Sequence, residues 1–320
     1  MRVTSNIESE GYVNSLPLDE MADDSEEEEK MNLEDEFHWL LDKEVHSILG
    51  QIQDLLKDCS HRFLPLHTDA DGNLLPLSTK YTSIKSETFV LSSANGNGVK
   101  GVVTLTGDVI SKADISMRYS VKGNNQILKT CLREDSSVLW RVQQIQDAGN
   151  HLKAALNIIS NTDSDCEFET GEEVVMLMDS IMSHIQKGQQ RLLNPAKPTL
   201  EDVFCNKFIK SLYPPLPQDM LLDFYLQGAK LVLQVYHLHA SPVPKLQKPS
   251  IITAGPRNRN IIEIGSSKYE VATTATVESH IPWVREVITC LTFALQLCQS
   301  LKDKIQVFST YWKNRLPAAR

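Results

Sequence analysis

The sequence predicts an α+β protein in which a four-helix bundle accompanies an antiparallel β-sheet domain. Four segments, near both ends of the chain and in its middle, repeat apolar residues in alternating steps of three and four, which is typical of coiled-coil and bundle seams. Between them lie short runs of β-branched residues separated by Asn and Gly, which predict strands joined by turns. The 320 residues are 41% hydrophobic and 23% charged, an ordinary globular composition that supplies enough apolar surface for a sizeable core.

At the N-terminal end, we expect a disordered acidic leader followed by the first bundle helix. Residues 1–31 hold ten acidic and two basic residues, net −8, and few large apolar residues, a composition that favours disorder. The simplest interpretation is a solubilising segment; the alternative is a docking tail for a basic surface, adjusted by phosphorylation of Ser25. The helix is expected over residues 32–63, with Asn32 as its N-cap. Its apolar seam consists of Leu41, Val45, Ile48, Ile52, Leu55 and Cys59.

Two helices are expected over residues 142–194 and a last one over residues 282–315. A capping-box pattern from Thr170 to Glu173 opens the second of the central pair, and Pro282 suits the first turn of the last helix. The seams are Val142, Ile145, Gly149, Leu152, Leu156 and Ile159; then Val174, Met178, Ile181, Ile185, Gly188 and Leu192; and finally Val284, Ile288, Leu291, Leu295, Cys298, Leu301, Ile305, Phe308 and Trp312.

The β-sheet domain is expected from residues 86–138 and 216–277. Residues 86–138 are predicted to form an antiparallel meander and residues 216–277 a pair of hairpins, because the strand-like runs are short and turn residues separate them. The expected strands cover 88–93, 101–107, 113–120, 126–134, 221–227, 230–240 and the two arms of a hairpin over 261–273. A short helix is expected to start at Pro198-Thr199.

The charge distribution predicts how the terminal helices pair. The chain carries 32 Lys and Arg against 41 Asp and Glu, net −9, which argues against a general nucleic-acid binder. Residues 32–62 have a net charge of −4 and residues 282–315 a net charge of +3. An antiparallel pair would bring Glu34–Glu36 near Lys313 and Arg315. Exposed pairs contribute little, so burial of the seams is expected to supply the stability.

Three motifs resemble ligand sites and are better explained by structure. Gly96, Gly98 and Gly101 match G-x-G-x-x-G, but a β-branched run follows where a dinucleotide site needs a helix, so a hairpin turn is expected. The stretch 69–73 begins like a calcium loop but lacks the required Gly and Glu positions, which favours a turn. His237 and His239 would share one strand face, without the further ligands of a metal site.

The remaining motifs also give no site. Cys290 and Cys298 lie two helical turns apart and are interpreted as seam residues, and Pro214–Pro217 is interpreted as a rigid entry into a strand. The sequence has no phosphate loop, nucleophile elbow, metalloprotease motif or catalytic Cys signature. We therefore assign no catalytic, cofactor-binding or metal-binding residues and expect no cofactor and no enzymatic activity. The residues that bind partners stay unassigned.

The compartment expected from the sequence is the cytosol or nucleus. The first thirty residues lack the basic and apolar regions of a secretory signal, and no apolar stretch approaches the roughly 20 residues of a membrane span. Six cysteines without a Cys-x-x-Cys pair indicate reduced thiols. We expect the protein to reach membranes only through a partner.

Several long segments resemble the Rogdi family. They are FHWLLDKEVHSILGQIQDLLKD, VKGVVTLTGD, NNQIL, WRVQQIQDAGNHLKAALNII, LPQDMLLDFYLQGAKLVLQVYHLHA and IPWVREVITCLTFALQLCQSLKDKIQVFSTYW, and together they span nearly everything from Phe37 to Trp312. The acidic leader and residues 241–260 lie outside the resemblance. It implies a leucine-zipper-like helical bundle with a β-sheet domain, and kinship with the small subunit of the RAVE complex. The family has no catalytic motif to carry over.

The resemblance implies a function in assembly. Complexes of this kind contain WD-repeat rabconnectin-type proteins and promote reassembly of the vacuolar proton-pumping ATPase, so we expect those proteins and peripheral pump subunits as partners. Family members are associated with synaptic vesicles and some with the nuclear envelope. Two alternatives are a generic coiled-coil adaptor or vesicle tether, and an enzyme with a site in the β-domain. We expect a monomer, because four seams in one chain can cover one another.

Overall fold

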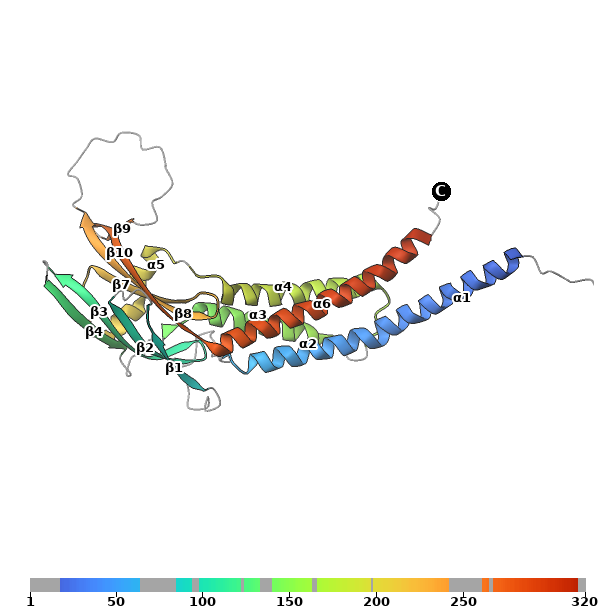
Figure 1. Ribbon diagram of the computed structural model, residues 1–320, viewed down its shortest axis with the longest axis horizontal. Helices are drawn as coiled ribbons and strands as arrows, with labels where there is room; N and C mark the ends of the chain where they lie inside the picture. The colour runs from blue at the N-terminus through green and yellow to red at the C-terminus, as the bar shows by residue number, and fades with distance from the viewer. Residues whose placement is uncertain are drawn as a thin grey trace, which may run out of the picture.

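The computed structural model describes residues 18–63, 85–93, 98–121, 124–132, 140–162, 166–196, 198–241, 261–264 and 267–315. The chain combines long helices with antiparallel sheets, which confirms the α+β class. The molecule is elongated, with the strands gathered at one end and the long helices running away from them (Figure 1). The calcium-like stretch 69–73 and most of the loop 241–260 lie outside the described residues.

Four long helical segments lie where the apolar seams predicted them. They are α1 Leu18–Trp39 with the π-helical turn η1 Leu40–Glu44 and α2 Val45–Ser60, then α3 Gln143–Asn161, α4 Gly171–Leu193 and α6 Pro282–Arg315. The short α5 Leu200–Cys205 begins with a complete capping box formed by Thr199 and Asp202, and the 3-10 turn η2 Lys207–Ser211 follows it. Thr170 caps α4 as predicted, accepting from the Glu173 N–H, whereas the Glu173 carboxylate accepts from the N–H of Glu169.

The first helix begins at Leu18 and not at Asn32. The prediction of a disordered leader through residue 31 is therefore wrong for residues 18–31, while residues 1–17 lie outside the described stretches of the chain. Two properties of the segment favour the helix. Glu, Met, Ala and Lys are strong helix formers, and acidic residues in the first turn interact favourably with the helix dipole.

The helix seams are buried, with shifts of one residue in three of them. The α4 seam is buried at every predicted position. In α2, Leu56 is fully buried and Leu55 only partly so. The corresponding shifts in α3 and α6 bury Ala148, Ala155, Val287 and Ala294 in place of Gly149, Leu156, Ile288 and Leu295. A helix has 3.6 residues per turn, so a strict 3.5-residue seam drifts around it, and contact with two neighbours moves the buried stripe.

Each of these helices packs against two others. The helix α3 contacts α4, α4 contacts α6, α6 contacts α2, and α2 contacts α3. The terminal helices run antiparallel, as predicted: Glu44 pairs with Lys304, and Arg62 pairs with Glu286 at 3.3 Å. The expected partners Lys313 and Arg315 have side chains outside the described set. These exposed pairs set orientation more than stability.

The strands form two antiparallel sheets. The first has the order β1-β2-β3-β4-β6, with β5 also pairing with β3; the second has the order β7-β8-β10-β9. Their bounds are β1 Ser86–Leu91, β2 Val99–Thr106, β3 Val109–Val121, β4 Asn124–Leu132, β5 Trp140–Arg141, β6 Leu212–Tyr213, β7 Met220–Leu226, β8 Lys230–Ser241, β9 Ile261–Ile264 and β10 Ser267–His280. The predicted meander and both predicted hairpins are confirmed.

One hydrophobic core runs from the helices into both sheets. Strands β1 and β10 connect the sheets, where Ser92 and Glu278 exchange backbone hydrogen bonds of 3.3 Å. Trp140 stands between the elements, its ring 5.0 Å from that of Phe224 and 5.8 Å from that of Phe208. The division into a helical domain and a β-domain stays a prediction, because the core is continuous between them.

Candidate interaction surface

The glycine motif belongs to a β-hairpin. Gly98 has a φ of 73°, in the left-handed region that favours glycine, and strand β2 follows it at once where a dinucleotide site needs a helix. Gly101 lies within β2, where an added Cβ would come 3.2 Å from the side chain of Leu91. The predicted hairpin is therefore confirmed for β1 and β2, with Gly96 outside the described residues.

The two strand histidines do not sit in a metal cluster. His237 is half-buried and His239 is exposed on β8. Within the described ranges, no group of three or more His, Cys, Asp or Glu side chains lies close enough to hold a metal ion. The Pro214–Pro217 stretch connects β6 of the first sheet to β7 of the second, and the Tyr213–Pro214 peptide bond is cis.

All six cysteines are free thiols. Burial raises the pKa of Cys298 to about 12. Burial, together with a hydrogen bond to Cys290 across the α2–α6 contact, raises the pKa of Cys59 to about 12. Both thiols are therefore protonated at neutral pH and poorly reactive.

The outward face of the first sheet carries a concave surface. Residues alternate along each strand, so Phe89, Val103 and Ile115 enter the core while their neighbours face outward. At the β1–β2 edge this face is polar, with hydroxyl pairs Ser86–Thr106 at 2.8 Å and Thr88–Thr104 at 3.0 Å. Across β2, β3, β4 and β6 it is hollowed, and the cavity measures about 410 Å³.

Two rows of side chains line this hollow, which we call the outer hollow. The register of β2, β3 and β4 places Ser116 between Lys100 and Lys129 in one row. The second row consists of Val102, Asp114, Cys131 and Tyr213. Cys131 donates to the Tyr213 carbonyl at 3.1 Å, and Thr130 donates to the Pro214 carbonyl at 2.7 Å, so the short strand β6 is fixed to the rim.

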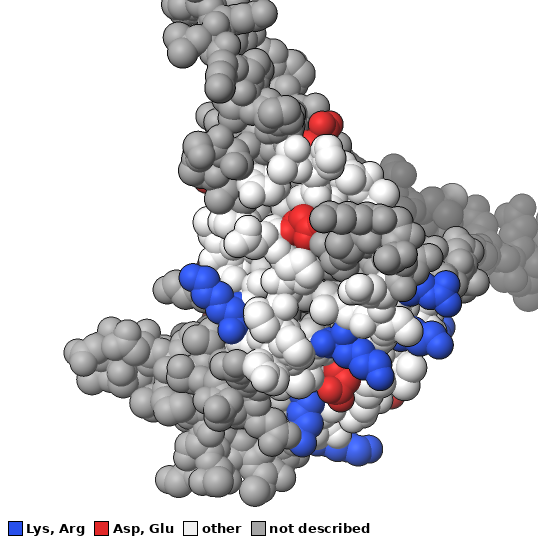
Figure 2. All heavy atoms as spheres, turned by 90° about the vertical axis from the view of Figure 1, so that its left-hand side faces the viewer, with Lys and Arg blue, Asp and Glu red and all other residues white. Residues whose placement is uncertain are grey.

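Positive charge predominates around the outer hollow. Lys and Arg side chains outnumber acidic ones on the visible face of the sheet end (Figure 2). Lys100, Lys129 and Arg118, which lies two residues beyond Ser116 on β3, are all exposed. Among the described residues none of these three takes part in an ion pair, whereas Lys302, Lys304 and Lys230 each pair with an acid elsewhere. Three apolar or aromatic residues of the same face are exposed as well: Val102 by 42%, Tyr213 by 55% and Ile127 by 67%.

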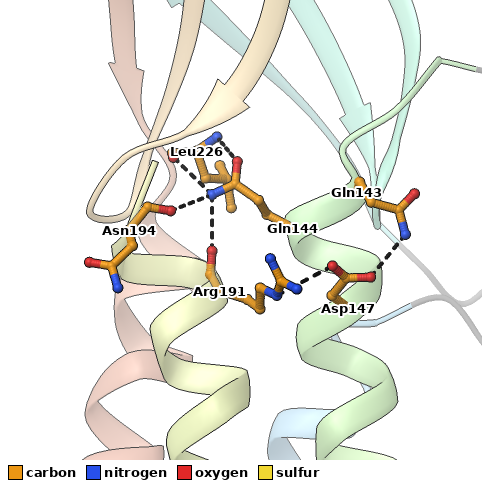
Figure 3. A network of polar contacts seen from close by, with 6 residues as sticks. All are labelled: Gln143, Gln144, Asp147, Arg191, Asn194 and Leu226. Carbon is orange, nitrogen blue, oxygen red and sulfur yellow. Dashed lines mark hydrogen bonds and ion pairs between the residues drawn. The ribbon is translucent and has the colours of Figure 1, made fainter. Parts of the chain in front are cut away.

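Gln144 joins the helices to the second sheet (Figure 3). The two N–H groups of its buried amide donate to three carbonyls, so that one N–H is shared: those of Arg191 at 3.0 Å, Asn194 at 2.7 Å and Leu226 at 3.0 Å. Its amide oxygen accepts from the Leu226 N–H at 2.7 Å. One side chain therefore satisfies carbonyls at the C-terminal end of α4 and both backbone groups of a β7 residue. We call this set the helix–sheet junction.

Polar residues on the surface continue the junction. Asp147 lies one turn along α3 from Gln143, accepts from its amide at 2.9 Å, and pairs with the Arg191 guanidinium at 3.4 Å. The N–H of Gly228, in the β7–β8 turn, donates to the Leu193 carbonyl at 3.0 Å. The end of α4 is thus held by groups from α3 and from the second sheet.

Two buried carboxyl groups lie in or beside the sheets. Burial raises the pKa of Asp108, and the Arg141 guanidinium at 2.7 Å acts in the opposite direction. Asp223 of β7 has no such cation: burial raises its pKa to about 6, against an ordinary value of 3.8, although a hydrogen bond from the Phe224 backbone opposes the shift. Asp223 is therefore largely ionised at neutral pH at a cost to stability.

The comparison with known proteins agrees with the fold. Residues 36–306, which include both sheets, the helices α2 to α5 and α6 up to residue 306, match the family model described as Rogdi leucine zipper containing protein. The chain belongs to the Rogdi family. The Rogdi homologue of Mus musculus is 40% identical over 294 residues, covering 90% of this chain and 96% of the mouse protein. The Danio rerio homologue is 38% identical over 289 residues, 90% and 97% of the two chains, and Drosophila melanogaster rogdi is 35% identical over 292 residues, 91% and 94%.

The Rogdi resemblance is thus confirmed, and the family match also runs through residues 241–260, which were expected to lie outside it. The interaction surface was missed from the sequence. Alternation along the strands marks Lys100 and Lys129 as exposed. Only the register of three strands shows that they flank one serine. None of the described helices is long and apolar enough to cross a lipid bilayer.

Proposed function

We propose that this Rogdi family chain is a non-catalytic subunit of a RAVE/rabconnectin-type complex that promotes assembly of the vacuolar proton-pumping ATPase. Membership of the Rogdi family over residues 36–306 carries the proposal, because the resemblance implies kinship with the small RAVE subunit. The partners are WD-repeat rabconnectin-type proteins and peripheral-sector subunits of the pump. The protein acts in the cytoplasm, bound through partners to synaptic vesicles or other endomembranes, or at the nuclear envelope.

We further propose that α2, α3, α4 and α6 form a leucine-zipper-like four-helix bundle that is closed within one chain. The pairwise contacts of these helices form a cycle. Each seam has completely buried residues within the single chain, for example Ile52, Leu152, Met178 and Leu291. A seam that is covered in this way does not need a second copy, so the protein should be a monomer.

The second candidate is a coiled-coil adaptor or vesicle tether. The observation that favours it is the exposure of Met31 and Trp39 on α1, 61% and 59%. Hydrodynamic mass separates the two: a stable dimer through α1 would favour the tether, and a monomer would favour the closed bundle.

Affinity isolation tests the proposed function. The full chain, tagged and recovered from cells under mild lysis, should bring down a WD-repeat rabconnectin-type protein and peripheral pump subunits. Depletion of the chain should slow reacidification of vesicles after the pump sectors have dissociated. Recovery of neither class of partner, together with unchanged reacidification, would contradict the proposal.

A further inference from the structure

We propose that the outer hollow binds an extended acidic segment of a partner protein, with two carboxylates on Lys100 and Lys129 and separate apolar side chains against Val102 and Tyr213. This assignment rests on the proposed role as an interaction subunit, and it adds the surface and the chemistry of what binds there. Four observations about the hollow carry it.

The first observation is its charge. The chain as a whole is acidic, net −9, yet Lys100, Arg118 and Lys129 gather on one sheet face, where Asp114 is the acid that lines the hollow among the residues that the structure describes. None of the ion pairs among the described residues involves these three cations. A cluster of like charge without ion pairs to the described part of the chain fits an acidic partner and repels a basic one.

The second observation is the spacing of the lysines. Lys100 and Lys129 lie on strands two apart in one row, with Cα atoms about 10 Å apart since neighbouring strands are separated by about 4.8 Å. In an extended peptide, side chains at positions i and i+2 point the same way about 7 Å apart. Lysine side chains are long enough to lean inward over this difference. An acid-x-acid segment laid across the strands therefore meets both ammonium groups.

The third observation is a pair of exposed apolar and aromatic side chains beside the lysines. Val102 and Tyr213 lie at two ends of the second row, and 42% and 55% of their surfaces are exposed. Exposed apolar and aromatic side chains next to unpaired cations are typical of an interface centre with a polar rim. A peptide with apolar residues on both sides of its acids can contact Val102 with one of them and Tyr213 with another.

The fourth observation is the concave shape. The hollow has a volume of about 410 Å³, which several side chains of a peptide segment can occupy and a flat lipid surface cannot. Three cations in a net-acidic chain also give only weak adsorption to an anionic bilayer. The surface therefore fits a peptide better than a membrane.

The direct test measures peptide binding by the full chain. A fluorescent peptide of alternating Glu and Leu should bind with an affinity that falls as salt rises, and a Gln–Leu peptide should bind much more weakly. The double variant Lys100→Glu, Lys129→Glu should bind the acidic peptide about tenfold or more weakly, because reversal replaces two attractions by repulsions. The matched control Lys153→Glu, Lys187→Glu carries the same charge change on exposed positions of α3 and α4, and should bind as the wild type does.

Two further variants keep the test decisive. Lys100→Gln, Lys129→Gln removes the charges without adding acids, should fold like the wild type by circular dichroism, and should also lose affinity. Val102→Thr keeps a β-branched side chain on the strand and should weaken the Glu–Leu peptide about two- to fivefold by removing apolar contact. Equal binding of the Glu–Leu peptide by the wild type and both lysine double variants would overturn the proposal. It would also be overturned if vesicles of anionic lipid bound to the wild type through the same lysines and the Glu–Leu peptide did not bind.

Affinity isolation with the lysine variants separates this inference from the proposed function. The wild type and the α3–α4 control should recover a WD-repeat rabconnectin-type protein, and Lys100→Glu, Lys129→Glu should lose it or recover much less. Full recovery by that variant would refute the assignment of the hollow and leave the proposed function standing. Failure of the wild type to recover the partner, with intact lysine-dependent peptide binding, would refute the proposed function and leave the surface standing.

Discussion

Replacing Gln144 tests whether the helix–sheet junction holds the molecule together. Gln144→Met keeps the length of the side chain and removes the bonds that its two N–H groups donate to three carbonyls and the one bond that its amide oxygen accepts. The N–H and carbonyl of Leu226 are left buried without partners, and each orphaned group costs about 1–3 kcal/mol. The carbonyls of Arg191 and Asn194 are only part-buried, so water can replace most of their loss. We expect the free energy of unfolding to fall by about 2–5 kcal/mol.

Urea unfolding followed by circular dichroism measures this change, with the slope against urea concentration unchanged. Hydrogen exchange should rise most at the end of β7 and the end of α4, where the lost bonds lie. The matched control is Gln143→Met, the preceding residue, which is exposed and bonds only to Asp147 on the surface. It should change the stability by less than about 0.5 kcal/mol. If the two variants lose similar amounts of stability, the junction does not have the role described.

Three further changes test the core and a buried carboxyl. The pKa of Asp223 is raised by burial from 3.8 to about 6, so its stabilising contribution is fully present below 3.8 and is lost as the pH rises through about 6. Between pH 3.8 and about 6 the wild type should therefore lose up to about 3 kcal/mol of unfolding free energy relative to Asp223→Asn. Unfolding of both proteins at each pH measures this difference, and a difference that does not change with pH would contradict the prediction. Gly171→Ala should destabilise by about 1–2 kcal/mol, because the new Cβ would lie 2.6 Å from a methyl group of Ile305 on α6. Its control is Gly50→Ala, at an exposed position of α2 where no packing neighbour lies within 4 Å of the new Cβ, and this change should stabilise by up to about 1 kcal/mol. Thermal unfolding measures both alanine variants. Leu291→Asp buries an unpaired charge on α6 and should lower the free energy of unfolding by at least about 3 kcal/mol. Its control Phe293→Asp, at a position that is 55% exposed, should lower it by less than about 1 kcal/mol. Similar soluble yields and melting temperatures for both variants would disprove the burial of the Leu291 face of α6.

Apolar spacing predicted the existence and order of the long helices because burial of a seam decides them. The α4 seam from Val174 to Leu192 is buried at every predicted position. In α6 the buried positions are Val287 and Ala294 where Ile288 and Leu295 were expected. Spacing alone does not say where neighbouring helices approach, so a one-residue rotation cannot be predicted from it.

The start of the first helix and the two polar sites depend on information that local sequence does not contain. For residues 18–31 we expected repulsion among the acids to outweigh their helix propensity and leave the segment disordered, but the structure has a helix there. Gln144 looks like one more polar residue of α3, since its bonding partners lie up to 82 residues away. Lys100 and Lys129 likewise become neighbours of Ser116 only through strand register.

The first turn of α1 and the last turn of α6 lie at the end of the molecule opposite the sheets (Figure 1). The 34 residues of α6 alone span roughly 50 Å at 1.5 Å per residue. In the proposed role as a subunit, partners bound at opposite ends, one on the projecting helices and one on the sheets, would be separated by about this length. The length of the helices would then set the distance between the two partners.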